Sequence, residues 1–265
     1  MFIDKLKTAW QQNESLVCVG LDPDKEKIPK HIAAEGQYYE FCKAIVDATA
    51  GACCAFKPQF AHFAAAGRES ELADLIAYIR TNYPRHVVIL DAKRGDIGST
   101  AAYYAEEAYE RYGADTVTLN PYLGLESIQP FLDYKDRGVT ILCRTSNADS
   151  DWLQNSDAPP IFERVARRVN EWNTHGQCML VTGATYPEEL GRVRELVADM
   201  PLLVPGIGAQ GGDLAAVMAH GKTPSGYGLV ISSSRGILYA GHGADFAEAA
   251  NSAAHELRAK INALR

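Results

Sequence analysis

Short, apolar, β-rich runs alternate with longer segments of helical periodicity along this 265-residue chain. The eight runs cover residues 15–22, 53–59, 86–93, 115–121, 139–146, 178–184, 201–208 and 226–234. Helical spacing of apolar residues marks 38–50, 70–82, 100–112, 161–174, 187–199 and 244–264. Strands that alternate with helices pair in parallel, and eight parallel strands can close a barrel. The pattern therefore predicts a (β/α)8 TIM barrel, with a doubly wound open sheet as the alternative architecture.

The composition agrees with one large globular domain. Hydrophobic residues make up 47% of the chain, which is enough for a substantial core. No linker, low-complexity tract or internal repeat interrupts the alternation, so residues 1–265 are predicted to form a single catalytic domain. The formal net charge of -7 argues against a long nucleic-acid surface, although a small anionic ligand needs only local positive charge.

The cysteines and the amino terminus indicate a cytoplasmic protein. The six cysteines lie mostly inside apolar runs and lack CxxC spacing, which predicts reduced core thiols rather than disulfides or a zinc site. Residues 1–13 have an amphipathic helical pattern without the apolar core of a signal peptide. Because no apolar run approaches the length of a bilayer crossing, no membrane association is expected.

Charged and polar residues follow most of the predicted strands. In a barrel, the chemistry collects at the carboxyl ends of the strands and in the loops that follow them. We therefore expect these side chains to converge on one rim. The set comprises Asp22, Lys57, Asp91, Lys93, Ser146, residues 206–212 and Arg235.

The third run ends in the sequence DAKRGD, which places alternating charges together. In an extended chain Asp91 and Lys93 point to one side while Arg94 points away. Lys57, from the neighbouring strand, can add a second ammonium, and Asp96 completes a set that alternates in sign. Such neighbours keep each other ionised even in a partly desolvated pocket. The alternative is an incidental ion pair in a solvated loop.

A glycine-rich segment, GIGAQGG, spans residues 206–212. It matches G-x-G-x-x-G, but no acid follows about twenty residues later, as a dinucleotide site requires. We interpret it as a site for a single phosphate, where Gly211 and its neighbours let backbone N–H groups approach. Gln210 can add a donor, and Arg235 can offer a bidentate fork from the next loop. The alternative is a flexible connector with a surface arginine.

Six motifs, in order across nearly the whole chain, carry a resemblance to a known family. They are VCVGLDPD, FKPQFAHF, LDAKRGDIGST, CRTSN, VPGIGAQGGD and SSSRGILYA. With them the chain resembles the orotidine 5'-phosphate decarboxylase family, particularly its longer bacterial form. The resemblance implies conversion of orotidine 5'-monophosphate (OMP) to UMP and CO2, the last step of de novo pyrimidine nucleotide synthesis. It also implies that the reaction needs no cofactor and no metal, and that a homodimer shares residues between active sites.

The same resemblance assigns a role to each motif residue. It implies that Lys93 protonates carbon 6 of the pyrimidine, that Asp91 lies near the departing carboxylate, and that Lys57 and Asp22 bind the ribose. It also implies that Asp96, Ile97 and Thr100 reach into the partner subunit's active site. Ser146 and Pro205 would contact the pyrimidine, and Gln210 and Arg235 would bind the phosphate. One departure is Ser234, where shorter members commonly have glycine. Asn120 and Asn147 have no assignment.

Three other functions remain open from the residues. Hexulose phosphate synthase, a metal-dependent relative, shares D-x-K-x-x-D but carries an acidic metal ligand where this chain has Lys57. A Schiff-base aldolase would use Lys93 or Lys57 as nucleophile, although flanking carboxylates keep these ammonium groups charged. A non-catalytic nucleotide-phosphate binding module is the third. The polar stretch 147–160 is expected to be a surface excursion rather than a lid.

Overall fold

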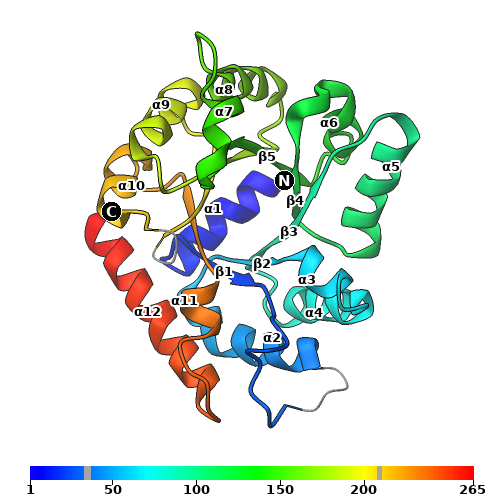
Figure 1. The fold of residues 1–265 in the computed structure, drawn as a ribbon, viewed down its shortest axis with the longest axis vertical. Helices are drawn as coiled ribbons and strands as arrows, with labels where there is room; N and C mark the ends of the chain where they lie inside the picture. The colour runs from blue at the N-terminus through cyan, green and yellow to red at the C-terminus, as the bar shows by residue number, and fades with distance from the viewer. Residues whose placement is uncertain (33–36, 208–210) are drawn as a thin grey trace.

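The computed structural model describes residues 1–32, 37–207 and 211–265. Within them, strands β1 to β8 pair in chain order and form a closed barrel. Every neighbouring pair is parallel, and Val17 of the first strand pairs with Ile231 of the last. The helices surround this barrel (Figure 1). The predicted (β/α)8 architecture is confirmed, and the doubly wound sheet is excluded because its edges would stay open.

The strands are short and almost wholly buried, as parallel strands covered by helices must be. They are β1 Val17–Leu21, β2 Ala55–Pro58, β3 Val87–Arg94, β4 Thr116–Leu119, β5 Gly138–Arg144, β6 Cys178–Thr182, β7 Leu202–Pro205 and β8 Leu229–Ser233. Exposure begins only at the ends of some strands, as in β3 after Asp91. Side chains at the carboxyl ends can therefore reach a ligand.

The longer helices cover the outside of the barrel by burying one apolar face each. In α2, for example, Phe41, Cys42, Ile45 and Val46 are buried at helical spacing. The helices are α1 Phe2–Gln12, α2 Gln37–Thr49, α3 Phe60–Ala64, α4 Glu69–Asn82, α5 Gly98–Glu106, α6 Leu125–Leu132, α7 Asp151–Gln154, α8 Ile161–Trp172, α9 Pro187–Val197, α10 Leu214–Gly221, α11 Arg235–Leu238 and α12 Phe246–Leu264. The short helical turns are η1 Ala50–Ala52, η2 Glu107–Arg111, η3 Pro121–Leu123 and η4 Ala148–Ser150.

The short helices α3, α7 and α11 were not predicted from the sequence, and neither were two longer ones, α6 and α10. Each of these two has only eight residues, too few for a clear periodic pattern, and α6 contains Pro130. The segment predicted as one helix over 100–112 is instead α5 followed by the π-helical turn η2. These differences do not change the order of strands, because α6 and α10 each connect two parallel strands and the other missed helices are followed by predicted ones.

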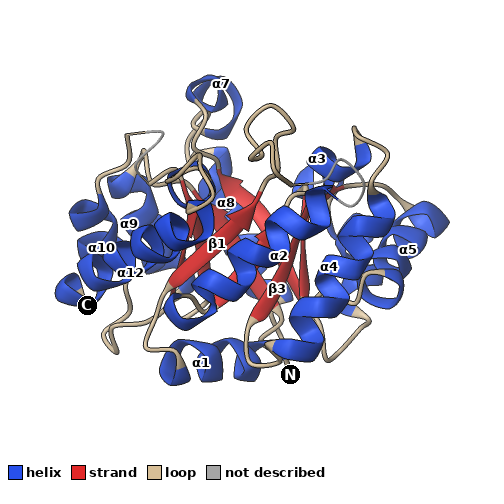
Figure 2. Ribbon diagram, turned by 90° about the horizontal axis from the view of Figure 1, so that it is seen from below, coloured by secondary structure: helices blue, strands red, loops and turns tan. Residues whose placement is uncertain are grey.

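Helix α1 lies across the amino-terminal end of the barrel (Figure 2). Its Phe2 ring packs against the start of β5, where a Cβ on Gly138 would lie only 2.5 Å from the ring. This end is thereby closed by apolar side chains, and the carboxyl-terminal end remains for ligand binding. All six cysteines are free and buried. None of the described helices has the length and hydrophobicity that a membrane crossing requires.

Candidate active site

A polar cavity of about 180 Å³ lies at the carboxyl-terminal end of the barrel. Residues at the ends of β1, β2, β3, β7 and β8 line it, so distant parts of the sequence meet there. Of the predicted site residues, those that line it are Asp22, Lys57, Asp91, Pro205 and Arg235. The predicted convergence on one rim therefore holds for Asp22, Lys57, Asp91 and Arg235.

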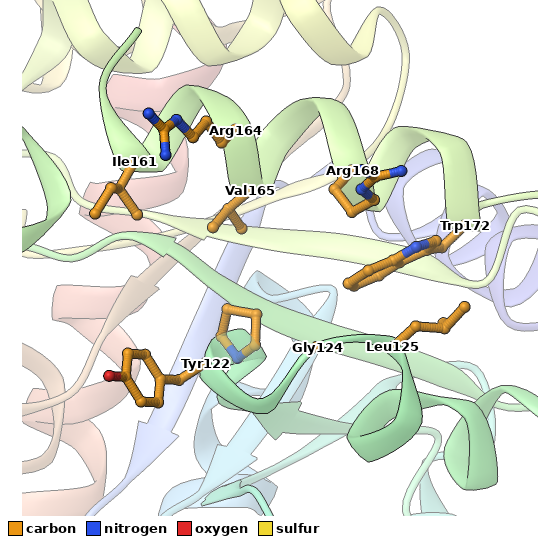
Figure 3. Close-up of a pocket in the computed structure, with 9 residues that line it drawn as sticks. Tyr122, Gly124, Leu125, Ile161, Arg164, Val165, Arg168 and Trp172 are labelled. Atoms are coloured by element: carbon orange, nitrogen blue, oxygen red, sulfur yellow. The ribbon is translucent and has the colours of Figure 1, made fainter. Parts of the chain in front are cut away.

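A larger groove of about 500 Å³ lies on the outside of the barrel, between the η3–α6 region and α8 (Figure 3). Its walls are largely apolar, with Tyr122, Leu125 and Trp172 among them, and none of the described residues that line it carries a carboxylate. Arg164 and Arg168 border it, but each is paired with a carboxylate, Arg164 with that of Asp157. The smaller cavity, with its opposed charges, is the better candidate for chemistry.

Asp91 is the centre of the polar network in the cavity. One carboxylate oxygen, Oδ2, accepts hydrogen bonds from Lys57 Nζ at 2.8 Å and Gln59 Nε2 at 3.1 Å. The other, Oδ1, accepts from Lys93 Nζ at 2.7 Å and Thr118 Oγ1 at 2.9 Å. Four donors thus hold a carboxylate that is only 6% exposed. Its orientation is fixed before any ligand enters.

The mutual charges keep this buried group ionised. Burial alone raises the pKa of Asp91, but the charges of Lys57 and Lys93 outweigh it and hold the pKa well below its ordinary value. Burial alone likewise lowers the pKa of Lys57, and the charges of Asp91 and Asp22 reverse that effect, so the net pKa is raised. The pair therefore titrates as a unit and stays charged near neutral pH.

The end of β3 departs from regular strand geometry. Lys93 has φ 47°, in the left-handed region that non-glycine residues rarely adopt, and the pairing with β4 shifts register between Leu90 and Arg94. The side chain of Arg94 points away from Asp91, as alternation predicts. Its guanidinium lies over the rings of Phe60 and Tyr104, at 4.3 and 4.5 Å, and hydrogen-bonds to a glutamate of η2.

Asp96 does not join Lys57 and Asp91 within the chain. Its Oδ1 accepts a hydrogen bond from the backbone N–H of Ile97 at 2.8 Å, and it does not line the cavity. Ile97 is 52% exposed, and Thr100 is exposed on the first turn of α5. Three of the four residues in the predicted alternating set, Lys57, Asp91 and Lys93, therefore meet in this chain.

The glycine-rich segment reaches the cavity with Gly206 and Ile207, which line it. Gly206 and Gly211 have φ of 102° and 83°, which other residues rarely adopt, and Gly212 N donates to Gly206 O at 3.1 Å. Gln210 lies outside the described residues. Arg235, the first residue of α11, lines the cavity and is exposed. Ser234 also lines it, and a Cβ on Gly20 would lie 1.9 Å from its Oγ.

Asp22 and Ser146 differ in their placement. Asp22 lines the cavity, and its Oδ1 is buried with no hydrogen-bond partner among the described residues. Such an oxygen suits a ligand hydroxyl. Ser146 lies just beyond β5 and does not line the cavity; its backbone packs on Gly183, and its carbonyl accepts from Thr185 Oγ1 at 3.2 Å.

The stretch 147–160 is tied to the barrel rather than loose. Arg144, fully buried at the end of β5, donates hydrogen bonds to Ser150, Asp151 and Glu189. Its guanidinium also lies 3.7 Å from the centre of the Tyr186 ring. These contacts join the segment after β5 to the start of α9, so the excursion begins as an ordered extension of the rim.

Sequence reasoning missed several residues at the site, among them Gln59, Thr118 and Ser232. Gln59 follows Lys57 by two positions, so alternation could have placed its amide, like the Lys57 ammonium, beside Asp91. Thr118 is a polar residue in a buried strand, and a buried polar side chain usually has a hydrogen-bond partner. Ser232 lines the cavity from β8. Asn120 caps η3 and accepts from Tyr122 N at 3.0 Å, which gives it a structural contact.

Comparison with known proteins was consistent across sequence and structure. The family model described as "Orotidine 5'-phosphate decarboxylase / HUMPS family" matches residues 15–250. Among curated proteins, the orotidine 5'-phosphate decarboxylase of Dechloromonas aromatica is 56% identical over 268 residues, with 100% of this chain and 99% of that protein covered. That of Cellvibrio japonicus is 55% identical over 270 residues, with the same coverage.

Solved structures resemble the whole barrel. The OMP decarboxylase of Leishmania donovani is 36% identical with a TM-score of 0.86, and the match covers 99% of this chain and 98% of that one. The UMP synthase of the same organism is 38% identical with a TM-score of 0.88, and the match covers 100% of this chain and 56% of the longer one. The chain belongs to the orotidine 5'-phosphate decarboxylase / HUMPS family.

Proposed function

We propose that the chain is a carboxy-lyase that converts OMP to UMP and CO2, in the last step of de novo pyrimidine nucleotide synthesis in the cytoplasm. The observation that carries the proposal is a buried carboxylate, Asp91, held between the ammonium groups of Lys57 and Lys93. The full-length relatives named as decarboxylases support the same activity. No metal and no organic cofactor takes part in the proposed reaction.

The chemistry follows from the two charges at the end of β3. When the bond between carbon 6 and the carboxylate breaks, the electron pair stays on carbon 6. The Lys93 ammonium stabilises this pair and then donates a proton to it, so that a C–H bond forms and CO2 leaves. Asp91 lies beside the departing carboxylate and accepts a hydrogen bond from the Lys93 ammonium until that transfer. The Lys93 side chain is half-exposed, so its ammonium can turn toward a ligand.

The other rim residues bind the parts of the nucleotide that do not react. Asp22 and Lys57 are proposed to bind the ribose hydroxyls, and Pro205 and Ser146 the pyrimidine. For Ser146 this requires the ligand to extend beyond the present cavity. The phosphate is assigned to Gln210, Gly211 and Arg235. Binding energy from these distant contacts can organise the charged groups.

We further propose that the protein works as a homodimer, in which Asp96, Ile97 and Thr100 enter the partner's active site. Several large apolar side chains lie exposed on the elements that follow β3 and β4, where α5 and α6 lie side by side (Figure 1). They are Ile97, Tyr103, Tyr122, Leu123 and Leu125. Exposed apolar side chains that gather on neighbouring elements are typical of a protein interface. Asp96 directly precedes Ile97, so association through these elements would bring it to a second site.

An activity assay with and without a chelator tests the reaction and its metal requirement together. Purified protein with OMP should show the ultraviolet absorbance change of decarboxylation, and an excess of EDTA should leave the rate unchanged. Lys57 stands at the end of β2, where the metal-dependent relatives carry an acidic ligand, and a cation there opposes metal binding. Loss of activity in EDTA, restored by Mg²⁺, would favour the hexulose phosphate synthase chemistry. Substrate-dependent trapping by borohydride would favour an aldolase.

Arg235→Ala tests the phosphate assignment. Loss of a charge-assisted, bidentate contact should raise KM for OMP by about 10- to 100-fold, from roughly 1.5–3 kcal/mol of lost binding. Steady-state kinetics on both proteins measure the change. Arg85→Ala is the control, since Arg85 is an exposed arginine before β3, at the opposite end of the barrel, and should leave KM unchanged. An Arg235→Ala enzyme with the KM of the wild type refutes the assignment.

A further inference from the structure

The left-handed backbone conformation of Lys93 requires stabilising contacts from neighbouring groups. A residue other than glycine rarely keeps φ near 47°, and the register shift beside it removes regular pairing with β4. Two backbone N–H groups beside this irregularity, those of Ala92 and Lys93, donate to a side chain of β4. One hydroxyl group is the acceptor for both N–H groups.

The hydroxyl of Thr118 accepts both hydrogen bonds. Its Oγ1 lies 3.0 Å from Ala92 N and 2.9 Å from Lys93 N, and it donates its own proton to Asp91 Oδ1 at 2.9 Å. A hydroxyl has two lone pairs and one proton, so the hydrogen-bonding capacity of this group is fully used. Thr118 is 1% exposed, and water does not compete for these bonds.

The contacts close a ring around the reacting charges. Asp91 Oδ1 accepts from Thr118, Thr118 accepts from the Lys93 backbone, and the Lys93 ammonium returns to Asp91 Oδ1 at 2.7 Å. We propose that Thr118 is a positioning residue, which sets the location of the Lys93 ammonium relative to Asp91 through this ring. The inference rests on the proposed decarboxylase function and adds to it a residue that need not touch the substrate.

Loss of the ring should affect turnover more than binding. With valine at position 118, the two N–H groups lose their acceptor and Asp91 loses one donor, although the side chain keeps its shape. The end of β3 can then relax toward regular strand geometry and carry the ammonium away from its place. Misplacement of a reacting group by about 1 Å costs on the order of 100-fold in rate. The ribose and phosphate contacts lie on other strands and are unchanged.

The same strand provides a matched control. Thr116 lies two residues earlier, on the same face of β4, and is fully buried. Its Oγ1 forms a hydrogen bond of 2.8 Å with Thr140 Oγ1, whereas Asp91 Oδ1 and the Lys93 backbone bond to Thr118 among the described residues. Thr116→Val therefore also removes a buried threonine hydroxyl from β4, but leaves the ring intact.

The experiment measures kcat, KM and the Kd for UMP in the wild type, Thr118→Val, Thr118→Ser and Thr116→Val, with thermal unfolding of each. Thr118→Val should lose about 100-fold in kcat while the Kd for UMP changes less than about threefold. Thr118→Ser, which keeps the hydroxyl, should retain kcat within about threefold of the wild type. Thr116→Val should show wild-type kcat even if its melting temperature falls.

Other results overturn the inference. A Thr118→Val enzyme with kcat near the wild type, or one that loses UMP affinity as much as kcat, contradicts positioning, as does an equal loss of kcat in Thr116→Val. If Thr118→Val does not fold, Thr118→Cys, close in size with a weak acceptor, should show the same split at about tenfold. Wild-type turnover of OMP is measured first. An inactive wild type contradicts the proposed function, whereas an active wild type with an unimpaired Thr118→Val contradicts only this inference.

Discussion

Replacing Lys93 by alanine should lower kcat for OMP decarboxylation by about 10⁴-fold or more, while UMP still binds. The ammonium has two roles in the proposed mechanism: it stabilises the electron pair on carbon 6 and supplies its proton. Electrostatic stabilisation by one group contributes about 10²- to 10³-fold and proton donation about 10²- to 10⁴-fold, and alanine loses both. UMP carries no carboxylate at carbon 6 and needs no proton, so its Kd should change little.

Lys93→Arg separates the two roles. A guanidinium retains the positive charge beside Asp91 but does not release a proton near neutral pH. If proton donation is essential, arginine should be almost as inactive as alanine. Turnover within about tenfold of the wild type in either variant would contradict the assignment of Lys93 as general acid. A wild type that binds UMP tightly but never decarboxylates OMP would instead indicate a binding module.

Most of the barrel could be predicted because its signal is repeated. Each of the eight runs lies at a strand in the structure, and a single error in one helix cannot change the parallel order. The short helices α6 and α10 were missed because eight residues give barely two turns of pattern. Their existence depends on the barrel surface against which they pack, which local sequence does not describe.

The site was predictable where local geometry decides it. Strand alternation placed Asp91 and Lys93 on one side and Arg94 on the other, which the structure confirms. The left-handed backbone at Lys93 could not be foreseen, because it depends on the hydroxyl of Thr118 from another strand. Contacts between residues far apart in sequence follow from barrel register, and register is set by the packing of the whole sheet.

The role of Asp96 is the one that the structure of a single chain explains least. Its carboxylate accepts a hydrogen bond from its own turn and does not line the cavity. Two explanations remain: Asp96 only stabilises the start of α5, or it serves the active site of a second subunit. The two make opposite predictions for mixtures of inactive proteins, because only a shared site can be rebuilt from two damaged chains.

Lys93→Ala and Asp96→Ala should each be inactive alone, the second by at least about 100-fold, yet a mixture should recover activity. In a heterodimer of the two, one site combines Lys93 from one protomer with Asp96 from the other and is fully native. Random reassociation of equal amounts makes half of the dimers mixed, each with one native site of two. The mixture, dissociated and reassembled together, should therefore reach about a quarter of wild-type activity.

The control mixture pairs Lys93→Ala with Asp91→Ala. These two residues contact each other within one subunit, with Lys93 Nζ 2.7 Å from Asp91 Oδ1, so every site in the mixed dimer keeps one defect. This mixture should stay inactive under the same reassembly. If the first mixture also stays inactive while size measurements show mixed dimers, Asp96 acts within its own chain. The shared site is then wrong, although the roles of Lys57, Asp91 and Lys93 would stand, because all three already meet in one subunit.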